Sequence, residues 1–347
     1  MNTDAVATEL NVEDFPALIT YLRTRGAISQ QEMPMLSNLE GGVSNRVVLV
    51  KPPTRAPFVV KQALPKLRVQ VDWFCTPERI TREALALSHL SELVRPGSVP
   101  RLLFHDPAAH LLAMEQVPEP HHNWKHLLLT GEVVDSHFEQ FGALLGAIHR
   151  ESAGKKDELQ GIFGSRDVFE TLRLEPYYRY TATQVPDAAP FLNTLIAETL
   201  ATQTTLVHGD YSPKNILVHA GRLVLLDCEV VHFGDPAFDL GFSMAHFLGK
   251  ANHLRHRRDA FAQAAVHYWR TYASCVSGAR WAENLEPRAV RHSLACCLAR
   301  VAGRSPLEYL TPTERAAQLT ITLRCLLAPP LTVCELFQRF LSELPCR

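Results

Sequence analysis

The sequence predicts an α+β fold in two parts. Residues 1–117 form a small, mostly antiparallel sheet with one internal helix, and residues 118–347 form a larger, mostly helical part that holds one β-hairpin. Strand-like apolar stretches separated by Pro- and Gly-containing turns predict the first part. Apolar residues at helical spacing, which begin after the prolines at 118 and 120, predict the second. The length of 347 residues is also typical of about two domains.

The first part begins with an amphipathic stretch that predicts a helix over residues 12–22. Thr76 is suited to cap a second helix, with Pro77 at its first position and its end near Leu93. The segment KPPTRAP is a turn, because adjacent prolines cannot continue a strand ladder. The predicted strands are residues 35–39, 46–50, 58–62, 101–104 and 111–116.

The second part has a strong strand signal in the stretches NILVH and RLVLLD. They are joined by Ala220 and Gly221, and the glycine supplies the positive φ of a hairpin turn. The surrounding sequence has helical periodicity. The predicted helices are residues 134–148, 188–202, 236–248, 256–273, 287–302 and 311–327.

The composition excludes several classes of protein. The net charge of −1 offers no bulk attraction for nucleic acid or an anionic membrane. No apolar run approaches the length of a membrane span, and the acidic start MNTDAVATELNVEDF lacks the features of a secretory signal. The eight cysteines contain no C-x-x-C pair, so we expect reduced thiols in a cytoplasmic protein.

Oxygen-bearing side chains gather around the hairpin, in LVHGDYSPKNILVHAGRLVLLDCE. Asp210 lies on the loop before the hairpin, Asn215 at its first strand and Asp227 at the end of its second strand. Because the two strands are antiparallel, we expect the three side chains to converge. Such hard oxygen ligands suit Mg²⁺, which binds few protein carboxylates together with phosphate oxygens. A metal there would also relieve the repulsion between the carboxylates.

This arrangement is typical of phosphoryl transfer, in which the protein mainly positions groups and neutralises charge. Asn215 and Asp227 would hold the metal on the phosphates of a nucleotide. Asp210, free of the metal, would accept the proton of an incoming hydroxyl. The alternative is that HGD is a plain turn and that the acidic residues are solvated.

Three motifs resemble those of the aminoglycoside phosphotransferase and choline kinase superfamily, the small-molecule relatives of protein kinases. They are HGDYSPKN, LLDCE and GDPAFDLG, and the resemblance covers about residues 35–250. It implies a two-lobed, protein-kinase-like fold, with an N-lobe over 1–117 and a C-lobe over 118–347. It also implies that His208 and Asp239 support the catalytic loop structurally.

The same resemblance implies the roles of the four oxygen-bearing residues. Asp210 is expected to be the catalytic base, and Asn215 and Asp227 to be Mg²⁺ ligands. Glu229 is expected at a second metal ion or at the substrate.

A nucleotide site requires a lysine on a strand to meet the phosphates and a helix glutamate to orient it. Lys61 in FVVKQ and Glu83 in the following helix fit these two positions. The alternative for Lys61 is an ordinary edge-strand lysine, which protects a sheet against aggregation.

Two further segments are expected at the nucleotide. The segment LEGGVSNRVVLV lies where a phosphate-covering loop belongs. We expect Gly41 and Gly42 in a tight turn and Ser44 facing phosphate. The alternative is a plain hairpin turn, which would explain each residue taken singly. The segment from Met114 to Val117 is expected to present backbone groups to the purine. Because backbone groups leave little trace in the side chains, the sequence does not distinguish ATP from GTP.

The acceptor substrate is the least determined feature. VVKQALP resembles methylthioribose kinase, but those kinases have a different catalytic-loop tail. Trp124 is a candidate for the nucleotide or substrate cleft, with a core position as the alternative. Arg300 and Arg304, among other C-terminal arginines, suit an anionic or neutral polyol better than a polycation, unless they are solvated or pair with Glu308 and its neighbours.

The sequence therefore predicts a Mg²⁺-dependent small-molecule kinase that moves the γ-phosphoryl group of ATP or GTP to a hydroxyl. Methylthioribose or another sugar, an aminoglycoside, choline and homoserine remain possible acceptors. The rivals are a nucleotide-binding pseudokinase that acts as a sensor or scaffold, and a nucleotide hydrolase without an acceptor. We expect no nucleic-acid or membrane partner, and the sequence is silent on oligomeric state.

Overall fold

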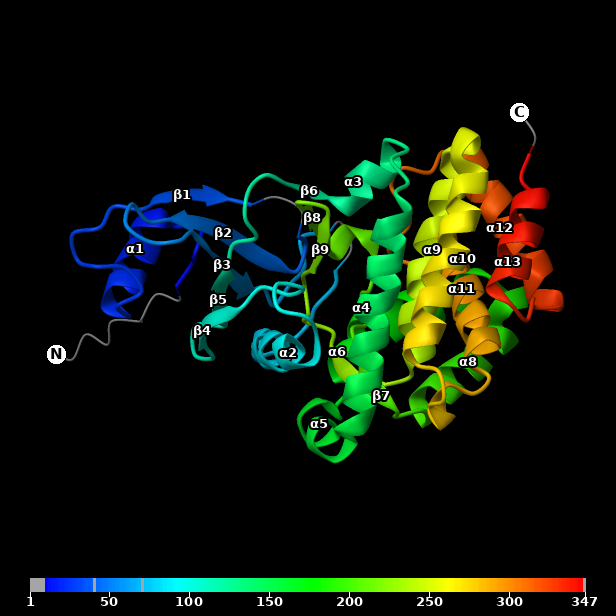
Figure 1. The fold of residues 1–347 in the computed structure, drawn as a ribbon, viewed down its shortest axis with the longest axis horizontal. Helices are drawn as coiled ribbons and strands as arrows, with labels where there is room; N and C mark the ends of the chain where they lie inside the picture. Colours follow the sequence, from blue (N-terminus) through cyan, green and yellow to red (C-terminus); the bar gives the residue numbers. More distant parts are fainter. Residues whose placement is uncertain (1–9, 40–41, 70–71, 346–347) are drawn as a thin grey trace. The chain divides into compact units, whose positions relative to one another are not determined.

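The computed structural model describes residues 10–39, 42–69 and 72–345 (Figure 1). The expectations about the start of the chain and about Gly41 concern residues outside these ranges. The α+β fold class is confirmed, since a sheet precedes a mainly helical region. Among the described residues, no helix combines the length and the apolar character that crossing a bilayer requires. The described cysteines form no disulfide.

The chain divides into two compact units. The first contains Met1–His89 and Pro100–Val117, and the second contains Leu90–Val99 and Pro118–Arg347. The segment Leu90–Val99 thus groups with the helical unit, although it precedes the last two strands of the sheet unit.

The first unit is built on a five-stranded antiparallel sheet with the order β1-β2-β3-β5-β4. Val60 in β3 pairs with Val48 in β2 and with Ala113 in β5, and all three side chains are buried against Leu18 and Leu22 of α1. The strands are β1 (Met35–Asn38), β2 (Asn45–Lys51), β3 (Phe58–Ala63), β4 (Leu102–Asp106) and β5 (Leu111–Glu115).

Both helices of this unit begin later than the sequence indicated. Helix α1 runs over Phe15–Thr24, because the side chain of Asp14 caps it by accepting the N–H of Ala17. Helix α2 runs over Arg79–Leu93, and the hydroxyl of Thr76 bonds the carboxylate of Glu78 instead of capping the helix. The buried guanidinium of Arg79 bonds the carbonyl oxygens of Leu64 and Thr76 at 3.0 and 2.9 Å, which ties the start of α2 to the end of β3.

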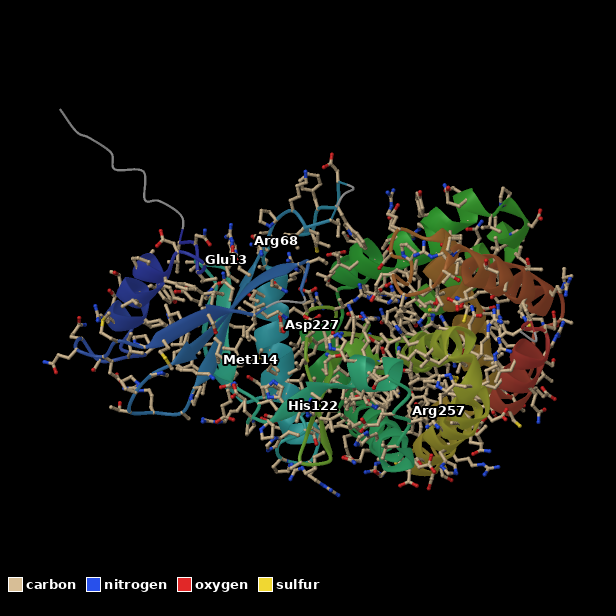
Figure 2. The ribbon with its side chains drawn as sticks, turned by 90° about the horizontal axis from the view of Figure 1, so that it is seen from above. Glu13, Arg68, Met114, His122, Asp227 and Arg257 are labelled. Carbon is tan, nitrogen blue, oxygen red and sulfur yellow. The ribbon has the colours of Figure 1, made fainter. Side chains whose placement is uncertain are left out.

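The first unit also carries ion pairs at its surface. Figure 2 shows Glu13 beside Arg68, and Oε2 of Glu13 lies 2.6 Å from Nη2 of Arg68 and 3.5 Å from Nε of Arg46. The three side chains are 25–46% exposed, so each pair contributes at most about 1 kcal/mol.

The second unit contains two small sheets and a group of helices. Its strands are β6 (His121–Asn123), β7 (Thr205–Val207), β8 (Ile216–His219), β9 (Arg222–Leu225) and β10 (His232–Gly234). Its longer helices are α3 (Trp124–Leu129), α4 (Asp135–Gly154), α5 (Lys156–Phe163), α8 (Ala189–Ala201), α9 (Pro236–His253), α10 (Arg258–Cys275), α11 (Leu285–Ala302), α12 (Pro312–Leu327) and α13 (Val333–Ser342). Its shorter helical segments are α6 (Asp167–Phe169), η1 (Glu170–Arg179), α7 (Tyr180–Gln184), η2 (Pro186–Ala188), η3 (Pro213–Asn215), η4 (Arg255–Arg257) and η5 (Arg280–Ala282).

Helix α9 is the centre of this unit. Its residues Pro236–Asn252 are all buried, and it packs against α10, α11, α12 and α13, which run alongside it in Figure 1. The contact with α11 requires Gly241, because a Cβ there would lie 2.3 Å from the Cβ of His292. A helix that is buried on every side is typical of a core position.

The sequence analysis missed α3, α5, α13 and the π-helical segment η1. All four are ten residues or fewer, so they offer few turns in which periodicity can be recognised. The predicted hairpin is present as β8 and β9, with Ala220 and Gly221 at φ +48° and +73° in its turn.

Candidate active site

The loop after β7 turns sharply at Gly209. This residue has a φ of +75°, and a Cβ there would lie 2.7 Å from Cγ1 of Val230. The backbone conformation and the lack of space both require glycine. The turn carries the next residue, Asp210, out of the strand and away from the β7–β10 ladder.

Asp239, in the first turn of α9, holds the backbone of this loop. Its carboxylate accepts the N–H of His208 at 2.7 Å and the N–H of Gly209 at 2.8 Å. The helix N-terminus favours a carboxylate at this place. The observed contacts are therefore those of a structural acceptor for the backbone of the HGD loop.

The ring of His208 makes a hydrogen bond through each of its two nitrogens. Nδ1 accepts the N–H of Asp210 at 3.2 Å, and Nε2 donates to the carbonyl oxygen of Leu226 at 3.2 Å. Burial lowers the pKa of His208, so the ring is neutral at pH 7. A neutral ring can serve as donor at one nitrogen and acceptor at the other, and it links Asp210 to the end of the hairpin.

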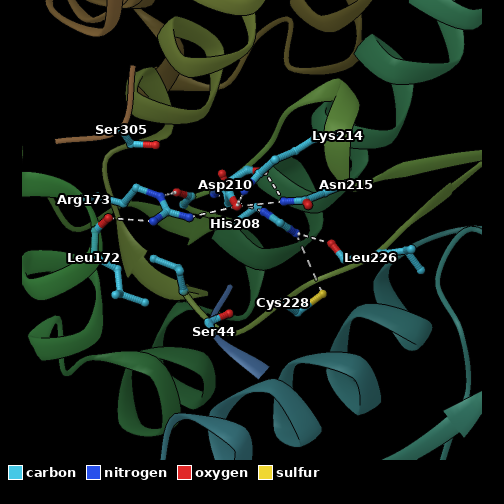
Figure 3. A network of polar contacts seen from close by, with 12 residues as sticks. Ser44, Leu172, Arg173, His208, Asp210, Lys214, Asn215, Leu226, Cys228 and Ser305 are labelled. Atoms are coloured by element: carbon cyan, nitrogen blue, oxygen red, sulfur yellow. Dashed lines mark hydrogen bonds and ion pairs between the residues drawn. The ribbon is translucent and has the colours of Figure 1, made fainter. Parts of the chain in front are cut away.

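Asp210 is only 2% exposed and its two carboxylate oxygens differ (Figure 3). Oδ2 lies 2.9 Å from Nη2 of Arg173, 2.8 Å from Nζ of Lys214 and 2.9 Å from Nδ2 of Asn215. Oδ1 has no hydrogen-bond partner among the described residues. Burial opposes ionisation, but the charges of Arg173 and Lys214 hold the pKa of Asp210 below its usual range. The group is thus an ionised carboxylate with one free oxygen, as a general base requires.

Arg173 is the main residue of this site that the sequence analysis missed. It lies on the π-helical segment η1, and its Nε donates to the carbonyl oxygen of Gly209 at 2.6 Å while Nη1 donates to that of Leu172 at 2.6 Å. It therefore holds both the backbone and the carboxylate of the catalytic loop. The local signal was weak: Pro176 inside a helical stretch marks a distorted helix, and π-helical turns are frequent at functional sites.

The hairpin brings the expected metal ligands toward the loop. Asn215 ends the short helix η3, just before β8, and its carbonyl oxygen accepts the N–H of Leu226 at 2.8 Å. Asp227 lies beyond the end of β9 and has a φ of +65°, a conformation uncommon for a residue with a side chain. Carboxylate oxygens of Asp227 and Glu229 lie within 4.8 Å of each other.

The donors in this group fit Mg²⁺. Nδ2 of Asn215 donates to Asp210, which leaves its amide oxygen as an acceptor for a cation. Two carboxylates within 4.8 Å of each other, at Asp227 and Glu229, repel unless a positive charge lies between them. The charge of Asp227 partly opposes the lowering of the Asp210 pKa by Arg173 and Lys214.

In the first unit, Lys61 and Glu83 form a buried ion pair. Nζ of Lys61 lies 2.7 Å from Oε1 of Glu83, and the side chains are 7% and 0% exposed. A lysine so held by a helix glutamate can present its charge in one fixed direction. Burial on both faces of β3 argues against the edge-strand alternative, because β3 lies between β2 and β5.

The other residues expected at the nucleotide differ in how closely they are constrained. The carbonyl oxygen of Ser44 accepts the N–H of Leu64 at 3.0 Å, and its hydroxyl accepts from Asn45. A Cβ added at Gly42 would have one neighbour within 4 Å among the described residues, the carbonyl oxygen of Asn45 at 4.0 Å. Met114 in β5 and Val117 are 8% and 7% exposed.

The residues expected at the substrate do not form one group. Trp124 is fully buried and packs edge-on against Phe138 and Phe141, with ring centroids at 5.1 and 4.9 Å, as a core tryptophan does. Arg304 pairs with Glu175 at 3.4 Å at the surface of the helical unit. Arg300 is buried and donates to the carbonyl oxygen of Ser305 at 2.8 Å.

The sheet-and-helix fold and the HGD loop define a chain of the protein-kinase-like class. Residues 36–278 match the model of the phosphotransferase enzyme family, so the chain belongs to that family. The predicted resemblance is thereby confirmed.

Similar proteins agree with this membership. Methylthioribose kinase of Yersinia pseudotuberculosis serotype O:3 (strain YPIII) is 26% identical over 218 residues, which are 55% of this chain and 52% of the relative. The chain thus spans about half the length of this relative.

Two solved structures share the fold. A choline/ethanolamine kinase family protein from Mesorhizobium loti has a TM-score of 0.53 at 16% identity, covering 94% of this chain and 99% of its own. Amicoumacin kinase hAmiN, in complex with AMP-PNP, Ca²⁺ and Ami, has a TM-score of 0.54 at 13% identity, covering 92% and 96%.

Proposed function

We propose that this protein is a small-molecule kinase that moves the γ-phosphoryl group of ATP or GTP to a hydroxyl of its acceptor. The acceptor oxygen forms a bond to the γ-phosphorus, the bond from that phosphorus to the bridging oxygen breaks, and the nucleoside diphosphate leaves. The hydroxyl proton passes to Oδ1 of Asp210. The observation that carries the proposal is the asymmetry of this buried carboxylate, with three donors on one oxygen and none on the other among the described residues.

Three residues would hold Mg²⁺, which neutralises charge on the phosphates when bound. They are Asn215, Asp227 and Glu229, and their oxygen donors support this role. Lys61, oriented by Glu83, would contact the nucleotide phosphates. The solved complex of amicoumacin kinase with AMP-PNP and Ca²⁺ supports a nucleotide and a divalent cation as the partners of this fold.

Methylthioribose is the first acceptor to examine, because a relative 26% identical to this chain bears the name methylthioribose kinase. Other hydroxylated metabolites belong in the same screen, since the alignment covers 55% of this chain. A cytoplasmic location accords with reduced cysteines.

The substitution Asp210→Asn tests the assigned base. We expect acceptor phosphorylation to fall by a factor of about 10² to 10⁴, as the loss of general base catalysis predicts. Mg²⁺-dependent stabilisation by ATP or GTP should remain, which would show that the variant folds and binds nucleotide. The control is Asp157→Asn at an exposed site in α5, which should leave the rate unchanged.

Near-native phosphorylation by Asp210→Asn would remove the assigned base. Metal-dependent nucleotide binding without transfer to any acceptor, and without hydrolysis, would support a pseudokinase instead. Nucleotide hydrolysis at the same rate with and without acceptors would support the hydrolase alternative.

A further inference from the structure

The interior of the helical unit holds two cations without carboxylate partners. Lys250 on α9 is fully buried and Arg300 on α11 is 5% exposed. No carboxylate of the described residues lies within ion-pair distance of either group. Nζ of Lys250 has one long contact, 3.4 Å to the carbonyl oxygen of His246 one turn earlier, and Nε of Arg300 has no partner in the described chain. Buried charges are ordinarily paired, so this arrangement calls for an explanation.

The neighbours of these groups do not supply the missing negative charge. Nη2 of Arg300 donates to Nε2 of His246 at 2.9 Å, and burial together with Arg300 lowers the pKa of His246 well below its usual value, so its ring is neutral. Lys125 on α3 pairs with Glu308, whose side chain is 65% exposed. Nζ of Lys250 lies 5.5 Å from the centre of the Tyr309 ring. The hydroxyl of Tyr309 also lacks a hydrogen-bond partner among the described residues.

These cations are linked in space to the catalytic carboxylate. The guanidinium of Arg300 lies over the rings of Tyr177 and Phe242 at 4.9 and 5.2 Å. The guanidinium of Arg173 lies over the same two rings at 5.8 and 5.7 Å, and its Nη2 contacts Asp210 at 2.9 Å. The two rings therefore separate Arg300 from the ion pair between Arg173 and Asp210.

Two further cations, whose charges act on His246 together with those of Lys250 and Arg300, are open to solvent. The side chain of Lys214, which contacts Asp210, is 43% exposed, and that of Lys125 is 25% exposed. We call Lys125, Lys214, Lys250 and Arg300 the cationic cluster. Its exposed members can bind an anion directly, and its buried members add a field that water screens weakly.

We propose that the acceptor is a hydroxy acid, whose carboxylate or other oxyanion binds at the cationic cluster while its hydroxyl meets Oδ1 of Asp210. This rests on the kinase function proposed above and names its substrate class. An anion at the exposed members supplies the negative charge that the fold lacks near Lys250 and Arg300. A polycation would be repelled by the same cluster, which argues against aminoglycosides and choline.

In the free enzyme, the buried members of the cationic cluster reduce the stability of the folded state. Burial, with added repulsion from Lys125 and Arg300, lowers the pKa of Lys250 to about 7, and Glu308 offsets only part of this effect. An anion nearby favours the protonated form. Acceptor binding should therefore weaken as the pH rises above about 7.

The test compares open-chain acceptors in which a carboxylate replaces a hydroxymethyl group: glycerate with glycerol, gluconate with glucitol, and ribonate with ribitol. We expect the acid of the productive pair to have a kcat/KM higher by on the order of tenfold or more, mainly through KM, as a unit charge a few ångströms away predicts. Lys250→Met should remove most of this preference, because it should lower kcat/KM for the acid more than kcat/KM for the neutral acceptor. Its control is Arg324→Gln, at a side chain 63% exposed, which should retain the preference.

A second measurement does not depend on turnover. Sulfate should raise the Tm of the native protein more than that of Lys250→Met, although the variant should be the more stable of the two without sulfate because it buries no charge. A preference for the neutral partner, or equal sulfate shifts in both proteins, would overturn the hydroxy-acid proposal. Loss of metal-dependent nucleotide binding would instead overturn the kinase function itself, so the two failures are distinguishable.

Discussion

Arg173 offers the sharpest test of how the catalytic loop is built. The substitution Arg173→Met keeps much of the side-chain volume but removes the guanidinium. It thereby breaks the 2.9 Å ion pair with Asp210 and the 2.6 Å hydrogen bond to Gly209. Removing one partner of a buried ion pair costs about 3–5 kcal/mol. Lys214 still contacts the same carboxylate oxygen, so we expect a loss near the lower end, about 3 kcal/mol, in urea denaturation.

The same change should move the acid limb of the pH–rate profile. Arg173 is the first of the charges that lower the pKa of Asp210 against the effect of burial. A carboxylate with a depressed pKa contributes stability above its unfolded pKa, and this stability is lost as the pH falls through the folded value. Without Arg173 the pKa rises, so the rate should begin to fall at a higher pH than in the native protein.

Arg179→Met, on the same π-helical segment, is the control. Arg179 is 42% exposed and pairs with Glu170 at 3.2 Å, so its loss should cost less than about 1 kcal/mol. If Arg173→Met is as stable as Arg179→Met and keeps the native acid limb, the reasoning about the catalytic loop is refuted.

Three other measurements check separate parts of the structure. Gly241→Ala should lower the free energy of unfolding by about 1–3 kcal/mol, because its Cβ has no space against α11. The control is Gly154→Ala, in an open helical position, which should raise the free energy of unfolding by about 0.5–1 kcal/mol. Lys61→Met should abolish the Mg²⁺-dependent Tm shift by nucleotide and break the buried ion pair with Glu83, at a cost of about 3 kcal/mol; a retained shift would exclude the phosphate role. The pKa of Lys250 is about 7 in the folded protein and 10.5 in the unfolded chain, so the unfolded chain binds more protons between these pH values. The free energy of unfolding should therefore rise with pH in this range. Lys250→Met should lack this rise.

The sequence carried strong information about the loop and the hairpin because the residues involved lie close together in the chain. The stretch from His208 to Asp227 contains the turn glycine, the carboxylates and the two strands that return one end to the other. Local spacing and strand pairing are enough to bring such residues together. The same holds for Lys61 and Glu83, which a strand and the next helix connect.

The sequence did not reveal Arg173, or the pairing of Arg300 with His246. Arg173 meets Asp210 only because η1 packs near the catalytic loop, and no motif links these distant segments. Trp124 shows the converse, since an aromatic residue beside a predicted site proved to be a core residue at 0% exposure. Burial and long-range contact depend on how helices pack, which single-sequence periodicity does not encode.

By itself the sequence determined the α+β class, the family resemblance and the HGD loop with its hairpin, because short-range spacing and backbone preference specify these features. The tertiary structure decided which oxygen of Asp210 is free, which arginine holds it, and that Lys250 and Arg300 are buried without a carboxylate. The physical reason is that ionisation and ion pairing depend on the distance to charges far along the chain and on the exclusion of water, and only packing sets these two quantities.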